Sequence, residues 1–566
     1  MLQVKKLNIY HRKDLHPLVS DLSFTLNGGD RAAIIGEEGN GKSTLLKLLH
    51  DPALVEDYTE YTGEILKNHA VCGYLPQELP PEDRERDVYT FLSQEPAFLE
   101  TDYRELAAMA GRLGLSVDLL YSGSRMGQLS GGEKIKVQLI RLMAVRPDLF
   151  LLDEPTNDID METLEWLEDF INSCPSPVLY ISHDETLLEH TANMILHMEQ
   201  RKRKTESQCT VFRTGYREYV ELRRKSLDRQ TRLAQEEKAA YEKQQEKFRR
   251  IHDKVEYQQA VISRQNPGGA RLLKKKMHAV KSMERRFEKQ AENMTRPPDT
   301  EEAIFFRFAP GEGIPAGKWV TDYELPLLDA GGRELSRNIK LQVRGSEKVC
   351  IIGKNGTGKT TLLRLIAGEL LPRTDIHAAY MPQNYEELLD LDSTPVEYLS
   401  RTWEQLPENG AADSSSANPA SDHFPARQMP EKGFSAPAAD GFSVRRIPNS
   451  RARALTKEEL TRIRTYLGSM KYTVQEMDHT IRELSGGQKA KLLLLKMSIN
   501  RCNVLILDEP TRNFSPLSGP VIRELLQDFP GAIISVSHDR KYIREVCSRV
   551  LELRQDGLAD VPRWNA

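Results

Sequence analysis

Short, unbroken runs of apolar residues occur twice along this chain in the same order. The first run of each set, residues 34–35 and 349–352, leads into a glycine-rich stretch. The second, residues 149–152 and 504–507, leads into an acidic pair. Apolar strands of this kind, separated by helical segments, are typical of a parallel sheet that is covered on both faces. The pattern therefore predicts an α/β fold in which two such sheets follow one another.

A charged helical segment separates the two repeats. From residue 220 to 295 helix-forming residues dominate, and Pro and Gly are nearly absent until Asn266-Pro267-Gly268-Gly269, which predicts two long helices that meet at a turn. Residues 221–290 hold 20 Lys and Arg against 10 Asp and Glu, a local charge of +10 in a chain whose formal net charge is −4. The predicted domains are a first α/β domain at 1–215, a basic helical-hairpin linker at 216–300 and a second α/β domain at 301–566.

One stretch of the second repeat, residues 407–455, is rich in Ala, Ser, Pro, Gly and Asp and poor in aliphatic residues. Such a composition cannot bury enough apolar surface to offset the entropy cost of ordering. We therefore predict a disordered surface insertion inside the second domain.

Cysteine usage and hydropathy narrow the class of protein. The six cysteines are scattered without CxxC spacing, which favours reduced thiols over disulfides or a metal site. The N-terminal residues lack the apolar core of a signal peptide, and no stretch approaches the ~20 apolar residues that span a bilayer. We expect a soluble, cytoplasmic protein that has no membrane contact.

Each repeat contains a glycine-rich loop of the pattern GxxxxGK[ST] after an apolar strand. The backbone N–H groups of such a loop wrap around a polyphosphate, its lysine neutralises β- and γ-phosphate oxygens, and its hydroxyl is offered to Mg²⁺. Two matches in matching positions predict two nucleotide sites, with Ser43 and Thr360 as magnesium ligands. The predicted phosphate-binding residues are Gly36, Glu37, Glu38, Gly39, Asn40, Gly41, Lys42, Ser43, Thr44, Gly353, Lys354, Asn355, Gly356, Thr357, Gly358, Lys359, Thr360 and Thr361.

An acidic pair ends a later strand of each repeat. Asp153 and Asp508 suit the shell of a bound Mg²⁺, whereas Glu154 and Glu509 are placed to orient and deprotonate an attacking water. Acids at a turn after a strand would be the simpler interpretation if either pair stood alone. Because the pairs recur in register with the glycine loops, we predict Glu154 and Glu509 to be catalytic.

Two further polar residues recur in register. His183 and His538 each follow an apolar strand and a serine, and we predict that they sense the γ-phosphate, although a lone His is more often structural. Gln77 and Gln383 lie in Tyr-Leu-Pro-Gln and Tyr-Met-Pro-Gln. A glutamine there could reach Mg²⁺ and the catalytic water when its loop closes, and we predict both roles for it.

The motif Leu-Ser-Gly-Gly-Glu/Gln before a long helix distinguishes this chain from other P-loop ATPases. Its small residues and helix N-terminus make a second anion site, which one repeat cannot fold onto its own phosphate loop. The motif is therefore expected to cap ATP bound to the opposite repeat. Its predicted nucleotide-binding residues are Ser130, Gly131, Gly132, Ser485, Gly486 and Gly487.

Both repeats resemble the nucleotide-binding domains of the ATP-binding-cassette (ABC) family, and the resemblance covers most of the chain. It implies two P-loop cassettes in tandem, joined by the helical-hairpin linker, and an ATP hydrolase that uses ATP and Mg²⁺. Site one would combine residues 36–44, Gln77, Asp153, Glu154 and His183 with Ser485 and Gly487. Site two would combine residues 353–361, Gln383, Asp508, Glu509 and His538 with Ser130 and Gly132. The residues that stack on adenine stay open, with Tyr10 a candidate at site one.

Two cassettes without a membrane segment, joined by a charged helical connector, resemble the ABC-F family in particular. The resemblance implies a monomer that binds the ribosome and contacts rRNA and P-site tRNA through linker 216–300, near the peptidyl-transferase region, as a translation factor or in protection against antibiotics. Basic residues crowd 261–290, as expected for contact with RNA phosphates, although a solvated helical spacer is the alternative. Residues 256–275 are the predicted tip.

Departures from the family pattern refine the expectation. Residues 157–160 read Asn-Asp-Ile-Asp, but the second copy, Arg512-Asn513-Phe514-Ser515, has lost the terminal Asp, so we expect two inequivalent sites. The short interval between Gly36 and Leu129 and the 28 residues after His538 favour the antibiotic-resistance type. Two alternatives remain, the ATPase subunit of an exporter with a separate membrane partner and a nucleic-acid maintenance ATPase.

Overall fold

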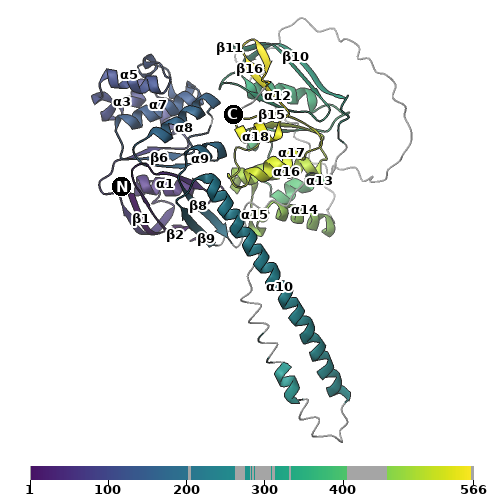
Figure 1. The fold of residues 1–566 in the computed structure, drawn as a ribbon. Helices are drawn as coiled ribbons and strands as arrows, with labels where there is room; N and C mark the ends of the chain where they lie inside the picture. Colours follow the sequence, from purple (N-terminus) through teal and green to yellow (C-terminus); the bar gives the residue numbers. More distant parts are fainter. Residues whose placement is uncertain are drawn as a thin grey trace, which may run out of the picture. The chain divides into compact units, whose positions relative to one another are not determined.

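The computed structural model describes most of the chain, and two compact units divide it (Figure 1). Described are residues 2–13, 15–157, 159–201, 206–261, 274–280, 282, 286, 308, 313–330, 333–403 and 456–562. One unit holds Met1–Tyr216 together with Glu301–Ala566, and the other is Arg217–Thr300. The predicted insertion at 407–455 and the predicted turn at 266–269 lie outside the described residues.

The first cassette is built around a six-stranded sheet in the order β5-β6-β7-β3-β8-β9. Neighbouring strands are parallel except at one edge, where β8 and β9 are antiparallel. A separate antiparallel sheet has the order β2-β1-β4. The strands are β1 (Leu2–His11), β2 (Pro17–Leu26), β3 (Arg31–Ile35), β4 (Thr59–Leu66), β5 (Cys72–Leu75), β6 (Leu149–Asp153), β7 (Val178–Ile181), β8 (Met194–Arg201) and β9 (Glu206–Phe212).

The second cassette repeats this topology. Its six-stranded sheet has the order β13-β14-β15-β12-β16-β17, again parallel except for the last pair, and β10 and β11 form an antiparallel hairpin beside it. The strands are β10 (Trp319–Ala330), β11 (Arg333–Arg344), β12 (Lys348–Ile352), β13 (Ala378–Met381), β14 (Val504–Asp508), β15 (Ala532–Val536), β16 (Arg549–Arg554) and β17 (Gly557–Asp560). The two predicted parallel sheets are confirmed.

Strand order explains why distant motifs meet. In the first cassette β7 lies between β6 and β3, so the carboxyl ends of all three strands share one edge of the sheet. Ligands of parallel sheets bind at this edge. The glycine loop follows β3, the acidic pair ends β6, and His183 follows β7. The order β14-β15-β12 does the same in the second cassette.

Helices flank these sheets and supply the helical subdomains. The signature serines are the N-cap residues of helices α7 and α16, each within a capping box. In the first cassette the helices are α1 (Lys42–His50), α2 (Pro81–Arg84), α3 (Val88–Ser93), α4 (Pro96–Glu100), α5 (Tyr103–Arg112), α6 (Val117–Leu120), α7 (Gly131–Ala144), α8 (Met161–Ser173) and α9 (Glu185–Thr191), with 3₁₀ turns η1 (Pro52–Leu54) and η2 (Met126–Gln128). In the second they are α12 (Lys359–Leu370), α13 (Pro395–Trp403), α14 (Lys457–Ser469), α15 (Val474–Asp478), α16 (Gly486–Ile499), α17 (Gly519–Gln527) and α18 (Arg540–Val546), with η3 (Tyr385–Glu387) and η4 (Ile481–Glu483).

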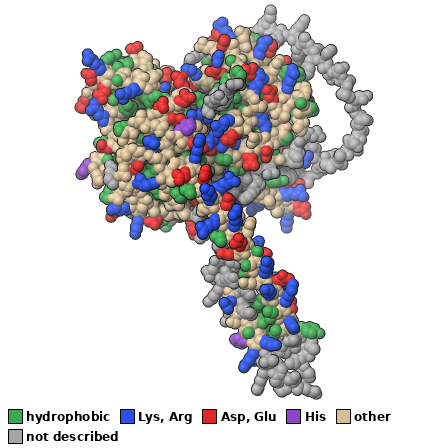
Figure 2. Space-filling model, in the orientation of Figure 1, with side chains coloured by type: hydrophobic (Ala, Val, Ile, Leu, Met, Phe, Trp, Pro, Cys, Tyr) green, Lys and Arg blue, Asp and Glu red, His purple; other side chains and the backbone are tan. Residues whose placement is uncertain are grey.

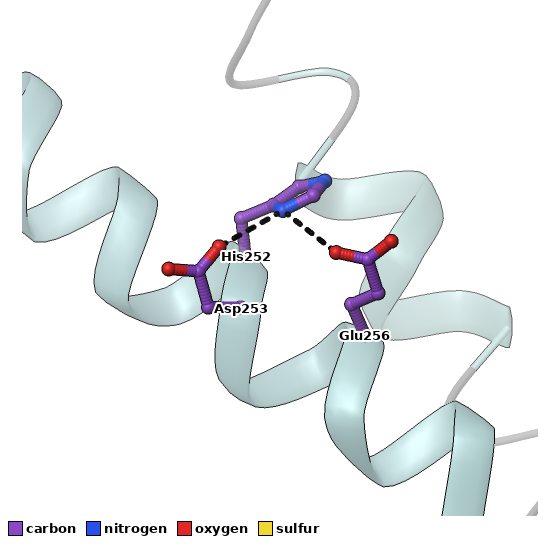
Figure 3. Close-up of side chains that lie close together, drawn as sticks. All are labelled: His252, Asp253 and Glu256. Atoms are coloured by element: carbon purple, nitrogen blue, oxygen red, sulfur yellow. Dashed lines mark ion pairs between the residues drawn. The ribbon is translucent and has the colours of Figure 1, made fainter.

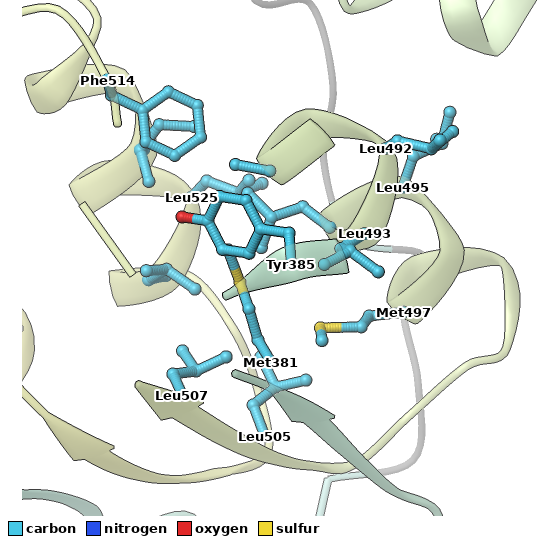
Figure 4. Packing of buried hydrophobic residues seen from close by; sticks show 14 of the residues in the cluster. Met381, Tyr385, Leu492, Leu493, Leu495, Met497, Leu505, Leu507, Phe514 and Leu525 are labelled. Carbon is cyan, nitrogen blue, oxygen red and sulfur yellow. The ribbon is translucent and has the colours of Figure 1, made fainter. Parts of the chain in front are cut away.

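The core of the second cassette joins its sheet to the signature helix. Leucines of α16 pack in the same cluster as Met381 of β13 and Leu505 and Leu507 of β14 (Figure 4). Phe514, which is 1% exposed, belongs to this cluster as well. The loop after β14 is therefore anchored to the core, although its backbone reaches the neighbouring cassette, as described below.

The linker unit begins with one long helix, α10 (Tyr216–Val261), and residues 274–280 are also helical. Figure 2 shows Lys and Arg side chains interspersed with Asp and Glu along its described part. Three pairs one helical turn apart explain this mixture, Lys225–Glu221, Lys238–Glu242 and Arg250–Glu246. Such pairs support an exposed helix by a few tenths of a kcal/mol each, roughly 0.2–0.5.

Candidate functional site

The two glycine loops adopt the same backbone conformation. Gly41 (φ 83°) and Gly358 (φ 92°) stand at the N-caps of α1 and α12 in the left-handed region, which glycine enters without steric cost. Lys42 Nζ donates to the carbonyls of Gly36 at 2.9 Å and Glu37 at 3.0 Å. Lys359 makes the matching pair of bonds in the second loop, at 2.7 and 2.9 Å. Each ammonium group is thus held inside its own loop, where phosphate oxygens would lie.

Oxygen ligands suited to Mg²⁺ gather beside each loop. The Ser43 hydroxyl donates to Asp153 Oδ1 at 3.0 Å, and Tyr74 donates to the other oxygen at 3.3 Å. Burial raises the pKa of Asp153 and of Asp508 to about 6 in each case. Among the described residues neither Asp508 oxygen has a hydrogen-bond partner in good geometry, although the nearby Thr360 hydroxyl partly offsets that pKa rise. A buried carboxylate next to a hydroxyl fits a hard divalent cation.

Both predicted catalytic glutamates occupy strained backbone positions. Glu154 has φ 48° and Glu509 has φ 50°, values that non-glycine residues rarely adopt. The backbone N–H of Glu154 donates to Ile181 at 3.1 Å, and that of Glu509 donates to Val536 at 2.9 Å. Strain of this kind persists only where surrounding structure enforces it, and it concentrates at functional sites. Here the backbone hydrogen bonds to β7 and β15 hold the two glutamates in this conformation.

At site one, Glu154 lies inside a closed set of polar contacts. Its carboxylate accepts from Gln77 Nε2 at 2.9 Å and Asn157 Nδ2 at 2.7 Å, and it lies 3.2 Å from His183 Nε2. His183 Nδ1 lies 2.8 Å from the carbonyl oxygen of Phe514, which belongs to the other cassette. A carbonyl only accepts, so Nδ1 carries a proton. A second proton, on Nε2, makes the ring a cation beside the Glu154 carboxylate, although among the described residues Nε2 has no hydrogen bond in good geometry.

The charges at site one follow from these contacts. Burial alone would raise the pKa of Glu154, but the His183 charge and hydrogen bond lower it to about 2. Burial would likewise lower the pKa of His183, and Glu154 raises it instead. The two side chains therefore form a buried ion pair.

Site two is arranged differently. His538 Nε2 lies 3.8 Å from Glu509 Oε1, and the carboxylate accepts a backbone hydrogen bond from His538 at 3.2 Å. Burial and the Asp508 charge raise the pKa of Glu509 to about 8, and burial with the Lys359 charge lowers the pKa of His538 to about 3. At site two these pKa shifts therefore favour the neutral forms of both side chains, although the two lie within ion-pair distance.

Each glycine loop faces the signature motif of the other cassette. At site one, the backbone N–H of Gly487 donates to Glu38 Oε2 at 2.8 Å. At site two, a cavity of about 1200 Å³ lies between the second glycine loop and the first signature motif. Residues predicted for site two on its lining are Ser130, Gly131, Gly132, Lys354, Asn355, Gly356, Gly358, Lys359, Thr360, Thr361, Gln383, Asp508, Glu509 and His538. His183, predicted for site one, lines this cavity as well.

The sequence motifs do not include several residues that the structure places in these sites. Tyr74 contacts Asp153, and Asn157 contacts Glu154. Tyr74 precedes Gln77 by three residues, as Tyr380 precedes Gln383, so the repeated tyrosine was a usable signal. The Phe514 carbonyl has no such signal in the sequence, because every residue has a backbone carbonyl.

Tyr10, the candidate for adenine stacking, pairs with Pro17 between β1 and β2. Its role stays a prediction.

A cluster of potential metal ligands also lies on α10. His252 Nδ1 is 3.5 Å from Asp253 and 3.6 Å from Glu256 (Figure 3). The two acids are exposed, and all three residues come from adjacent turns of one helix. These contacts are explained as local ion pairs of a charged helix.

Fold and site together define a pair of P-loop cassettes in which each glycine loop faces the signature motif of the other. The family model described as ABC transporter matches residues 19–157 and 336–512, more than half of the chain. The chain therefore belongs to this family, as a tandem ABC ATPase of the ABC-F type. Among the described residues, no helix has the length and apolar character to cross a bilayer.

Known relatives match nearly the full chain. The probable ATP-binding protein YheS of Escherichia coli K12 is 26% identical over 98% of this chain and 80% of its own length. ATP-binding cassette sub-family F member 2 of Bos taurus is 25% identical over 94% and 77%. Among solved structures, the archaeal ribosome recycling factor aABCE1, in complex with the ribosomal stalk protein aP1, aligns with a TM-score of 0.54 at 15% identity, over 98% and 90%. That likeness supports the fold.

Proposed function

We propose that this protein is an ATPase that binds the ribosome with two ATP molecules held between its cassettes, and that hydrolysis releases it. The observation that carries the proposal is the pairing of each glycine loop with the opposite signature motif. Nucleotide bound there would join the cassettes, so closure of the pair would depend on ATP. A partner that binds only one state of the cassette pair would then be bound and released once in each cycle of ATP binding and hydrolysis.

The chemistry proposed for each site is hydrolysis of ATP to ADP and phosphate. Lys42 and Lys359 would neutralise phosphate charge, and Glu154 and Glu509 would orient and deprotonate the attacking water. Mg²⁺, held by Ser43, Asp153 and Gln77 or by Thr360, Asp508 and Gln383, would neutralise charge on the phosphates. His183 supports the water-orienting role of Glu154, because its ion pair keeps that carboxylate ionised.

The ribosome is the proposed partner because of the linker and the relatives. Residues 221–290 carry a net +10, and no acidic residue occurs from 257 to 283. Ribosomal RNA attracts such density through release of counterions. A protein of the same fold is described as a ribosome recycling factor, which agrees with this partner. The proposed compartment is accordingly the cytoplasm.

The finer part of the proposal concerns where the linker acts. We place linker 216–300 near P-site tRNA and the peptidyl-transferase region, where it would serve translation or protect the ribosome against antibiotics. Residues 256–275 would form the contacting tip.

A non-hydrolysing variant tests the proposal. With Glu154→Gln and Glu509→Gln, ATP should bind but not be cleaved, so the protein should stay on ribosomes and block translation. Sedimentation through sucrose with ATP measures the first effect, and translation in a cell-free extract measures the second. Glu64→Gln with Glu552→Gln, at two surface ion pairs, makes the same change of charge and should leave both readouts unchanged.

A variant that sediments free of ribosomes in the presence of ATP would overturn the ribosome proposal. Stimulation of ATPase activity by ribosomes, DNA and membrane vesicles, compared in one assay, separates the proposed partner from nucleic-acid maintenance and transport. Only ribosomes should stimulate.

A further inference from the structure

The two glycine loops differ at their second and third positions. The first loop has Glu37-Glu38 where the second has Lys354-Asn355. These positions decide what each loop offers to the opposite cassette. Glu38 Oε2 accepts the backbone N–H of Gly487 at 2.8 Å. Glu37 accepts hydrogen bonds from Ser515, at 2.7 Å, and from Ser518.

The second loop has the opposite polarity. Lys354 Nζ lies 2.8 Å from Glu162 Oε2, and the backbone of Asn355 hydrogen-bonds Asp160. At site one the acids belong to the glycine loop and hydroxyl groups face them. At site two the acids belong to the opposite cassette. Ser515 stands where the first repeat has Asp160, and the glycine loop that Ser515 faces carries the carboxylates of Glu37 and Glu38 instead.

Glu38 accepts the backbone hydrogen bond that the signature motif could otherwise donate to a bound anion. Gly487 lies in the first turn of α16, a helix of 14 residues whose N-terminus carries partial positive charge. The Cβ of a substituted Gly486 would lie 3.1 Å from the same Glu38 oxygen, so the carboxylate fills this end of the motif. The corresponding end of the first signature, at Gly132, lines the cavity of site two.

We propose that Glu38 competes with the γ-phosphate of ATP for the Gly487 amide at site one. ATP therefore fills site two first and enters site one only by displacing this carboxylate. The inference rests on the proposed ATP binding and adds the order in which the sites fill. A γ-phosphate needs the amide that Glu38 holds, and it also meets the charge of that carboxylate. ADP has no γ-phosphate, so its binding should depend little on Glu38.

The test isolates each site in the non-hydrolysing Glu154→Gln/Glu509→Gln protein. Lys359→Ala disables site two, and the affinity for a fluorescent ATP analogue with Mg²⁺ then reports site one. Adding Glu38→Asn, the residue of the second loop, should tighten this affinity on the order of tenfold, because a charge-assisted hydrogen bond no longer has to be displaced. The affinity for the matching ADP analogue should change by less than about twofold.

The reciprocal exchange is the matched control. In the protein with site one disabled by Lys42→Ala, Asn355→Glu should weaken ATP binding at site two by a similar factor. Glu38→Gln keeps the size of the side chain and removes its charge, so it replaces the Asn variant if thermal unfolding shows that variant to be misfolded.

Unchanged ATP affinity in both Glu38 variants, while ATP binds at both sites, overturns this inference and leaves the proposed function standing. Equal tightening of ATP and ADP also overturns it, because general repulsion would then replace competition for the Gly487 amide. Failure of the unmodified protein to bind ATP at either site overturns the proposed function itself.

Discussion

At the scale of single residues, the two nucleotide sites differ in where they place their charges. The pKa shifts favour the charged forms of Glu154 and His183 at site one but the neutral forms of Glu509 and His538 at site two. Glu37 is a partly buried carboxylate whose hydrogen-bond partners lie in the other cassette. Burial alone would raise its pKa, but the charge of Lys491 and the hydroxyl groups of Ser518 and Ser515 lower it below the ordinary 4.5.

The lowered pKa of Glu37 predicts a pH-dependent contribution to stability. A carboxyl group whose pKa is lower in the folded state stabilises the protein above its unfolded pKa and loses this effect as the pH falls. Glu37→Gln should therefore reduce the free energy of unfolding by about 1.5–3 kcal/mol at neutral pH. The difference from the unmodified protein should shrink as the pH falls below 4.5. Thermal unfolding from about pH 7 to about pH 3.5 measures it.

Glu82→Gln, at an exposed position of α2, is the control for the same change of charge. A difference for Glu37→Gln that stays constant with pH would contradict the assignment.

At the scale of elements, buried ion pairs join helices of the two cassettes. Arg523 of α17, 4% exposed, lies 2.5 Å from Glu185 of α9, which is 8% exposed, and Lys541 of α18 is 2.9 Å from the same carboxylate. Arg540 pairs with Glu168 of α8 in the same region. These contacts hold α9 against α17 and α18 of the second cassette, and His183, two residues before α9, lies beside the Phe514 carbonyl.

Removing one partner of such a pair is predicted to be costly. Arg523→Met leaves Glu185 with Lys541 alone, and it should lower the free energy of unfolding by about 3–5 kcal/mol. Combining it with Glu185→Leu should recover much of that loss, because no unpaired charge then stays buried. Denaturant unfolding of Arg523→Met, of Glu185→Leu and of the double variant measures the coupling between the two side chains. Arg554→Met, which breaks a pair with Glu552 on the surface, should cost no more than about 1 kcal/mol. Equal effects of Arg523→Met and Arg554→Met would contradict the structural role.

At the scale of the whole molecule, charge is concentrated in the linker. The chain has a net charge of −4, while residues 221–290 alone contribute +10. Within α10 many cations have an acidic neighbour one turn away, as in Lys225–Glu221. Lys274, Lys275 and Lys276 instead lie within the stretch from 257 to 283 that contains no acid. This stretch has the charge to contact RNA phosphates.

The proposed RNA contact predicts a particular salt dependence. Changing Lys274, Lys275 and Lys276 to Gln should weaken ribosome binding and reduce the slope of log affinity against log salt by roughly two to three, because about three counterions are no longer released. Lys225, Lys238 and Arg250 are the matched control, since each has an acidic partner. Titration of ribosomes at several salt concentrations measures the slope. Equal slopes for both triple variants would contradict specific contact by the stretch from 257 to 283.

Local sequence patterns predict the two sheets, the glycine loops, the acidic pairs and the long first helix of the linker, because each depends on residues close together in the chain. Apolar runs define strands locally, and phosphate loops need a contiguous backbone. The departure at Ser515 also indicated unequal sites, but not how they differ.

The contacts between the two cassettes, in contrast, follow from the three-dimensional packing of the chain. Glu38 and Gly487 are 449 residues apart, and His183 and Phe514 are 331 apart. No local pattern encodes such pairs, since they depend on how two folded surfaces pack. The left-handed backbone of Glu154 and Glu509 is likewise set by hydrogen bonds to neighbouring strands, not by the residue type.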